Sequence, residues 1–216
     1  MTRWLELLLL STLTLSPASP QAIASDWSQQ LDGVVNAHEL EGAAVHEIPG
    51  GELFLRRSGQ ILDVAIRTSP LSVASLCLAA GNEVHVLHAS AALGAVTYRR
   101  RDATYVSSEN FEWGMREQGM DEQTQSLRQR YFADHGWVAS TMRMGTRGQV
   151  EMRIDLDRLP PGPVHVALGL MSEDGSVSGW PRERAGECAN QGLVSGSPPA
   201  SLEFSPDNWP RVPDVD

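Results

Sequence analysis

The stretch ELFLRRSGQILDVAIRTSPLSVASLCLAAGNEVHVLHASAALGAVTYR, residues 52–99, decides the fold. Apolar side chains alternate with polar or small ones along it, most clearly at Leu62, Val64 and Ile66, and a period of two places one apolar row on one face of a strand. Pairs typical of turns, such as Ser-Gly and Gly-Asn, separate the apolar runs. The stretch therefore predicts five consecutive short strands that form the meander of an antiparallel β-sandwich.

The residues on either side of this stretch extend the all-β pattern. Further strands are predicted at residues 44–48, 103–107, 137–144, 150–157, 164–170 and 202–204. Apolar residues at helical spacing over residues 120–131 predict one short surface helix, which we expect to end near Gly136. The chain after Met171 is rich in Gly, Ser and Pro, and this composition predicts a loop-rich C-terminal segment from about residue 171.

The first 24 residues have the features of a secretory signal peptide. Arg3 supplies a positive charge, an apolar run follows, and the small residues of Ala22-Ile23-Ala24 are typical of a cleavage site. The apolar run is too short to span a bilayer, and no later stretch is long enough to do so. We therefore expect residues 1–24 to be removed and residues 25–216 to form a single domain, secreted or periplasmic.

The charge balance excludes several classes of partner. The formal net charge is −10, and all 17 basic residues are Arg, because the chain contains no Lys. Nucleic acids and anionic membranes are bound by clusters of Lys and Arg, and an acidic protein repels both. The one basic run, Arg99-Arg100-Arg101, is interpreted as a solvated strand end. We expect no nucleic-acid ligand, although a protein partner remains an alternative.

Two cysteines, Cys77 and Cys188, are the only ones in the chain. In an oxidising compartment two cysteines favour a disulfide, which here would close a loop of more than one hundred residues. Cys77 lies on the face of its strand opposite Leu76 and Leu78, where a covering loop would meet it. Two buried free thiols are the alternative. A catalytic thiol is not favoured, because neither cysteine has a neighbouring His or helix start to lower its pKa.

The segment DGVVNAHELEGA, residues 32–43, resembles the opening of DOMON-like domains and of family 9 carbohydrate-binding modules. In those families Asp-Gly is followed by Glu-Trp and a small residue, and Leu40 stands here at the Trp position. The strand GQILDVAIRT also resembles the one that follows in these families, and the resemblance covers about residues 31–170. It implies a jelly-roll-type β-sandwich that binds carbohydrate or another small ligand without catalysing a reaction.

Tryptophans in loop-like sequence are the candidates for a ligand platform. Sugar rings stack on aromatic faces while polar side chains bind the hydroxyl groups. Trp113 with Arg116, and Trp180 with Arg182, are therefore predicted to form a ligand site at one loop end of the sandwich. The alternative interpretation is that each tryptophan simply packs over an open end of the sandwich.

A haem site is the sharpest alternative. Some DOMON-like domains hold a b-type haem with axial Met plus His or Lys, which would make the protein an electron-transfer domain. The resemblance offers His88 with Met142 or Met144 as ligands, with Met152 and His165 as further candidates. The competing interpretation of His88 is a core histidine that is hydrogen-bonded to a backbone carbonyl. The methionines have a competing interpretation too, because Met at strand spacing is more often core filler.

Other chemistries find less support in the sequence. No zinc-protease motif, no paired Cys-x-x-Cys and no Gly-x-Ser-x-Gly occurs, so we expect neither a transition-metal site nor an enzyme. Similar modules sometimes hold a structural calcium near the opening turn, and Asp32, Glu39 and Glu41 are candidate ligands, although a solvated acidic loop explains them equally. A structural or partner-binding protein of the cell envelope is the third functional hypothesis.

Overall fold

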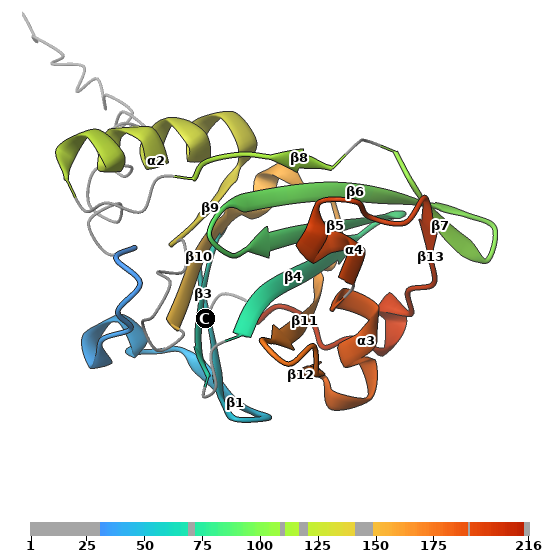
Figure 1. Cartoon of the computed structure of the whole chain (residues 1–216), viewed down its shortest axis with the longest axis horizontal. Coiled ribbons are helices and arrows are strands. Elements are labelled where there is room, and N and C mark those ends of the chain that lie inside the picture. The colour runs from blue at the N-terminus through green and yellow to red at the C-terminus, as the bar shows by residue number, and fades with distance from the viewer. Residues whose placement is uncertain are drawn as a thin grey trace, which may run out of the picture.

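The chain folds into two packed antiparallel β-sheets, with one long helix along one side (Figure 1). The computed structural model describes residues 31–68, 72–108, 111–116, 121–140, 149–189 and 191–213. The predicted signal peptide, residues 1–24, lies outside the described residues. The prediction of an all-β antiparallel sandwich is confirmed. No helix among the described residues is both long and apolar enough to cross a membrane.

Sheet A has five strands in the order β1-β2-β3-β10-β9. Their bounds are Ala44–Ile48 (β1), Gly51–Ser58 (β2), Ile61–Thr68 (β3), Trp137–Ala139 (β9) and Gln149–Asp155 (β10). The predicted tight turn after Ser58 joins β2 to β3. These two strands pair antiparallel, and Ser58 opposite Ile61 is the pair next to the turn. β10 comes from a distant part of the chain and pairs with β3 along its length, so sheet A contains a pairing between strands that are remote in sequence.

Sheet B follows the order β12-β11-β4-β5-β6-β7-β13, and β8 pairs with β6 beside this path. The bounds are Ser72–Ala80 (β4), Glu83–Ala89 (β5), Leu93–Arg101 (β6), Thr104–Ser107 (β7), Glu112–Trp113 (β8), His165–Ser172 (β11), Val177–Trp180 (β12) and Ser201–Leu202 (β13). All five strands predicted within residues 52–99 are present. The chain passes from sheet A to sheet B between β3 and β4, so the meander supplies both layers of the sandwich.

The main core lies between the two sheets and follows the period of two. Leu62, Val64 and Ile66 of β3 are buried against it, as are Leu76 and Leu78 of β4. Because alternate side chains point to opposite faces, the same strand period that predicted the sheets also predicted which residues fill this core.

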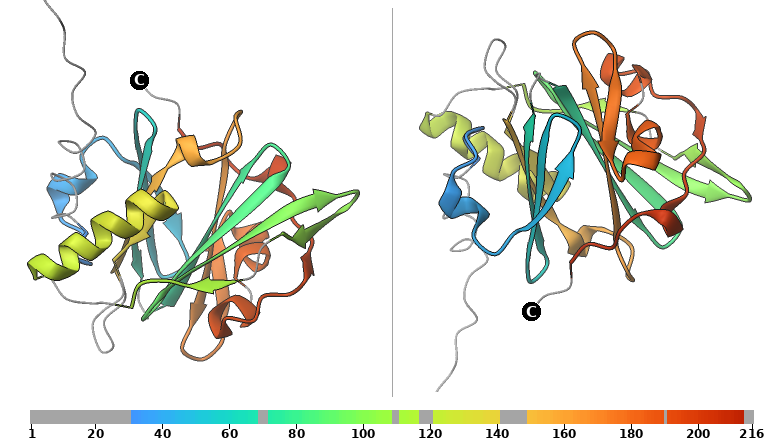
Figure 2. Two further views of the ribbon diagram at one scale, coloured as in Figure 1. Left: turned by 90° about the horizontal axis from the view of Figure 1, so that it is seen from above. Right: turned by 90° about the horizontal axis from the view of Figure 1, so that it is seen from below.

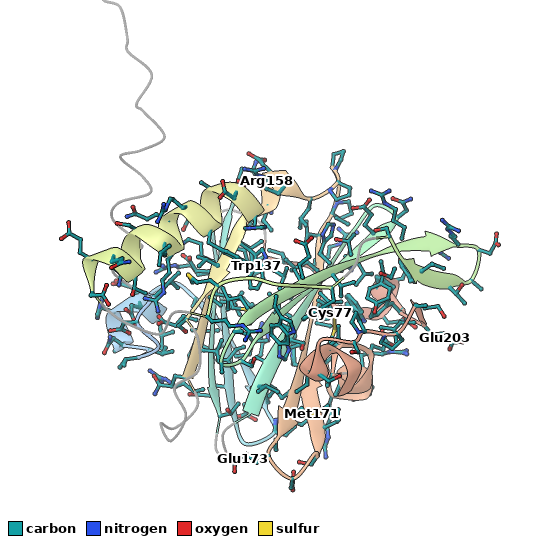
Figure 3. The ribbon with its side chains drawn as sticks, turned by 45° about the horizontal axis from the view of Figure 1, so that its top comes forward. Cys77, Trp137, Arg158, Met171, Glu173 and Glu203 are labelled. Atoms are coloured by element: carbon teal, nitrogen blue, oxygen red, sulfur yellow. A yellow bond between two sulfur atoms is a disulfide. The ribbon has the colours of Figure 1, made fainter. Side chains whose placement is uncertain are left out.

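A second apolar layer covers the outer face of sheet B, and the C-terminal segment supplies it. This segment contains four short helices: η3 (Arg182–Arg184), α3 (Ala185–Cys188), α4 (Gln191–Ser195) and η4 (Pro206–Asn208). Cys77 and Cys188 form the predicted disulfide, whose cysteines are fully buried in this layer beside Leu193 and Phe204 (Figure 3). The segment predicted as loop-rich is thus more regular than expected, because a few buried anchors hold it without any apolar period.

Helix α2 (Glu122–His135) is the predicted surface helix. The side chain of Asp121 accepts a hydrogen bond from the N–H of Thr124 at its start, and Gly136 ends it in the left-handed conformation with φ 72°. The helix packs on β9, the edge strand of sheet A (Figure 1). Two 3₁₀ turns also lie among the described residues before the C-terminal segment, η1 (Ala37–Leu40) and η2 (Leu156–Arg158).

The two sheets meet along one edge and open along the other. At the edge strands β1 and β12 the rings of His46 and Trp180 lie 4.4 Å apart, and Figure 2 (right) shows β1 beside the orange β11–β12 hairpin. At the opposite edge, β9 with α2 faces β6 with β8. A cleft lies at this open edge.

Candidate functional site

A cleft of about 1240 Å³ lies at the open edge of the sandwich. One wall comes from sheet B, where β5 and β6 contribute His85 and Thr97 over an apolar floor that includes Leu87. The other wall comes from α2 and β9, which contribute Tyr131 and Trp137. The cleft therefore joins residues from both sheets, far apart in sequence, and only the sandwich brings them together.

Strand β8 divides the cleft into an inner and an outer half. Glu112 pairs with Ala95 and Trp113 pairs with Gly94, and cross-strand partners project to the same face of a sheet. Ala95 belongs to the face that packs toward sheet A. Glu112 therefore points into the inner half, between the sheets, and Trp113 points into the outer half, under the C-terminal segment.

Three glycines let aromatic rings approach the backbone around the cleft. A side chain on Gly94 would collide with the ring of Phe111, one on Gly114 with Tyr131, and one on Gly196 with the indole of Trp113. All three rings line the cleft. Their placement thus depends on missing side chains at three separate points of the chain.

A hydrogen-bond network fixes His85 in the inner half. Its Nε2 lies 3.1 Å from a carboxylate oxygen of Glu83, and its Nδ1 lies 3.2 Å from the hydroxyl oxygen of Thr97. Glu83 also forms an ion pair with Arg99, at 2.8 Å. Both ring nitrogens of the imidazole have a partner, so the orientation of the ring in the wall of the cleft is fixed.

Tyr131 is the central ring of the opposite wall. The ring of His135 lies 4.3 Å from it at a tilt of 31°, and Trp137 meets it edge-on at 5.7 Å. Burial, and then the charge of Glu112, raise the pKa of Tyr131 to about 12. The phenol therefore keeps its proton at neutral pH and can donate a hydrogen bond.

Arg158 lies at the rim of the cleft, beside the end of α2 (Figure 3). Its guanidinium donates to the carbonyl oxygen of Ala133 at 2.7 Å, and its Nε lies 3.9 Å from a carboxylate oxygen of Asp155. A cation at the C-terminal end of a helix complements the helix dipole. Arg158 therefore holds α2 against η2 and closes one side of the cleft.

The four residues predicted as a sugar site do not lie together. Trp113 lines the cleft, in its outer half, whereas Arg116 is exposed outside it. Trp180 and the exposed Arg182 lie at the other edge of sheet B. Four strands separate β12 from β8, which places the two tryptophans about 24 Å apart at the usual strand spacing.

His88 is buried on the outer face of sheet B rather than between the sheets. Its neighbours in β5, Leu87 and Ala89, belong to the inter-sheet core, so His88 points the other way. Its Nδ1 lies 2.9 Å from the hydroxyl oxygen of Ser75, and its ring meets Trp113 edge-on at 5.7 Å. Its Nε2 has no hydrogen-bond partner among the described residues.

The candidate haem ligands are not brought together by the part of the chain that the structure describes. Met152 lies in the core between the sheets, so sheet B separates it from His88. The Nδ1 of His165 is bonded to the carbonyl oxygen of Trp209, at 2.8 Å. Met142 and Met144 lie outside the described residues. No arrangement seen here favours a haem between His88 and a methionine.

His88 should make the protein sensitive to acid. Burial lowers the pKa of its imidazole from 6.5 to about 4, so the unfolded chain binds more protons between these values. We expect this group to contribute about 3 kcal/mol above pH 6.5 and to lose that contribution as the pH falls to 4. His88→Phe should remove this component from chemical denaturation curves measured across the range. The exposed His38→Phe is the control, and an unchanged acid loss in His88→Phe would contradict the assignment.

The acidic opening segment bonds mainly to itself and to sheet A. The carboxylate of Asp32 accepts the N–H of Val34, and that of Glu39 accepts the N–H of Asn36. Glu41 is exposed. Across the described ranges no group of three or more His, Cys, Asp or Glu side chains is arranged to hold a metal ion, so nothing here favours the calcium alternative.

Comparison of the chain with known proteins finds no matching family model, no matching curated protein and no matching solved structure. Sequence reasoning identified Trp113 of the outer half but missed the residues of the inner half, namely His85, Glu112, Tyr131 and Trp137. Tyr131 carried one signal, its place on the apolar face of the predicted helix. The others carried none, because their neighbours in the cleft belong to strands remote in sequence.

Proposed function

We propose that the protein is an exported, non-catalytic domain that binds a carbohydrate or a similar small polar ligand in this cleft. The observation that carries the proposal is the combination, in one cavity between two sheets, of aromatic rings with hydrogen-bonding groups whose orientation is fixed. Tyr131 provides a ring, against which the buried Trp137 packs edge-on, and His85 and Thr97 provide the polar edge. The resemblance of the opening segment to family 9 carbohydrate-binding modules supports the same ligand class.

The chemistry of a sugar matches these walls. A pyranose ring has an apolar face of C–H groups that stacks on an aromatic ring, and a rim of hydroxyl groups that needs donors and acceptors. Ligand pockets for drug-sized molecules enclose roughly 300–1000 Å³. At about 1240 Å³, the cleft has room for a short oligosaccharide.

Glu83 and Thr97 hold both ring nitrogens of His85, so the imidazole has a fixed orientation in the wall of the cleft. Ser75 and His88 bond to each other, but both are buried on the outer face of sheet B. Export is supported by the disulfide, which is typical of oxidising compartments, together with the predicted signal peptide.

Glycan-array screening followed by calorimetric titration tests the proposal. Tyr131→Leu keeps an apolar contact with the fold but removes the ring, and we expect it to weaken sugar binding at least tenfold, about 1.4 kcal/mol. Thr97→Val, which keeps the shape of the side chain, should weaken binding by removing one polar contact.

Trp180→Leu is the matched control, since it removes an aromatic ring at the opposite edge of sheet B and should leave affinity unchanged. Melting curves of all three variants separate lost binding from lost folding. Binding of no saccharide on the array, or an effect of Trp180→Leu equal to that of Tyr131→Leu, would contradict the proposed site.

A further inference from the structure

The carboxylate of Glu112 lies in the inner half of the cleft without a partner among the described residues. The side chain is exposed and lines the cleft, and its carboxylate forms no ion pair or hydrogen bond with any described residue, whereas its backbone pairs with Ala95 of β6. A charged side chain in a binding cleft that is not matched by the protein itself is available to a charge on the ligand.

The charge of Glu112 lies close to an aromatic ring. Glu112 and Tyr131 both line the cleft, and Gly114, two residues after Glu112, lies against the ring of Tyr131. After burial, the charge of Glu112 is the second cause of the raised pKa of Tyr131. The face of Tyr131 carries the negative part of its quadrupole, and a carboxylate beside it adds to the attraction for a cation. The same site therefore offers a cation two favourable contacts.

The two arginines near the cleft, Arg158 and Arg99, already have acceptors or carboxylates of the protein as partners. Arg158 bonds to the end of α2 and lies beside Asp155, and Arg99 forms its ion pair with Glu83. His85 is engaged on both nitrogens, which leaves the exposed His135 as the remaining titratable cation of the cleft. The net charge of −10 adds a field of the same sign as Glu112.

We propose that the ligand of this cleft is an amine-bearing saccharide, whose ammonium group pairs with Glu112 over the face of Tyr131. The inference rests on the proposed function and narrows its ligand class. An exposed ion pair contributes about 0.2–1 kcal/mol and an exposed cation–π contact about 0.5–1 kcal/mol, which together correspond to an affinity gain of roughly three- to thirtyfold.

Two oligosaccharides of equal length test this inference, one of glucosamine units and one of N-acetylglucosamine units. Titrated at mildly acidic pH and low salt, where the free amines are protonated, the glucosamine oligomer should bind roughly three- to thirtyfold more tightly. Glu112→Gln should abolish that preference while keeping the melting temperature, because the side chain is exposed. Glu173→Gln, at a surface loop away from the cleft, is the matched charge control (Figure 3).

The outcomes separate the two proposals. Equal affinity for both oligomers would overturn the amine preference and leave saccharide binding standing. A preference that survives in Glu112→Gln would overturn the assignment to this carboxylate. Binding of neither oligomer, together with no binding on the glycan array, would overturn the proposed function itself.

Discussion

Replacing Cys77 and Cys188 together by alanine is expected to lower the free energy of unfolding by about 4 to 5 kcal/mol. The two cysteines are 111 residues apart, and in the chain-entropy model a cross-link that closes a loop of about this length removes that much freedom from the unfolded state. The disulfide also holds α3 on sheet B, where the backbone after Cys188 packs directly on Gly169. Loss of the bond should therefore loosen the whole cover of the outer face.

Chemical denaturation of the variant and of the wild type, with and without reductant, measures this effect. Reduced wild type serves as the control, since it keeps both sulfur atoms but lacks the bond, and it should lose nearly as much stability as the double variant. Fluorescence of Trp209, which is buried in the covering layer, should report the loosening. A loss below about 1 kcal/mol in both samples would show that the cover is held by packing alone.

Glu151→Gln is expected to stabilise the protein at alkaline pH, by as much as about 5 kcal/mol at pH 9. Glu151 is buried under the opening segment, where its carboxylate accepts the N–H of Gly33 at 2.7 Å. Burial, opposed by that hydrogen bond and reinforced by the charges of Glu39 and Asp32, raises its pKa from 4.5 to about 8.

The sign of this effect follows from proton binding. Between pH 4.5 and 8 the folded protein binds more protons at Glu151 than the unfolded chain does, so stability falls as the pH rises through this window. Each unit of pKa difference corresponds to about 1.4 kcal/mol. At pH 4.5 and below, where the carboxyl is protonated in the folded state, glutamine and glutamate should give nearly equal stability.

Denaturant midpoints measured from pH 4 to pH 9 test this expectation. The slope of stability against pH should flatten in Glu151→Gln and stay as in wild type in Glu47→Gln, which removes an exposed carboxylate from β1. Parallel curves for wild type and Glu151→Gln would mean that Glu151 ionises normally in the folded protein. The slope of stability against pH that Glu151 causes is opposite in sign to the slope that His88 causes. Stability contributed by His88 is lost as the pH falls, and stability at Glu151 is lost as the pH rises.

The predictable part of the fold came from short-range patterns. Alternation at Leu62, Val64 and Ile66 identified β3 and its buried face, and the terminal Gly136 marked the end of α2. These signals are local, because the strand period and the helix cap depend on neighbouring residues only. The C-terminal cover lacked such a signal, because single anchors such as Phe204 and Trp209 hold it, and their burial depends on sheet B being there first.

The candidate site was less accessible to sequence reasoning. Trp113 and Trp180 look alike along the chain, yet four strands lie between them, and only the strand order of sheet B places them at opposite edges. The haem hypothesis needed His88 beside a methionine, but its neighbours Leu87 and Ala89 face the inter-sheet core, so His88 lies on the outer face of sheet B. A shift of one residue in a strand exchanges the two faces, so such placements require the pairing partners to be known.

The sequence by itself determined the two-layered all-β architecture, the main core rows, a surface helix ending near Gly136 and the pair of cysteines, because each follows from local periodicity or from counting. The tertiary structure alone decided that Glu112, Tyr131, His85 and Trp137 share one cavity. Non-local strand pairing and glycines at three distant points bring these side chains together, and neither leaves a periodic trace in the chain.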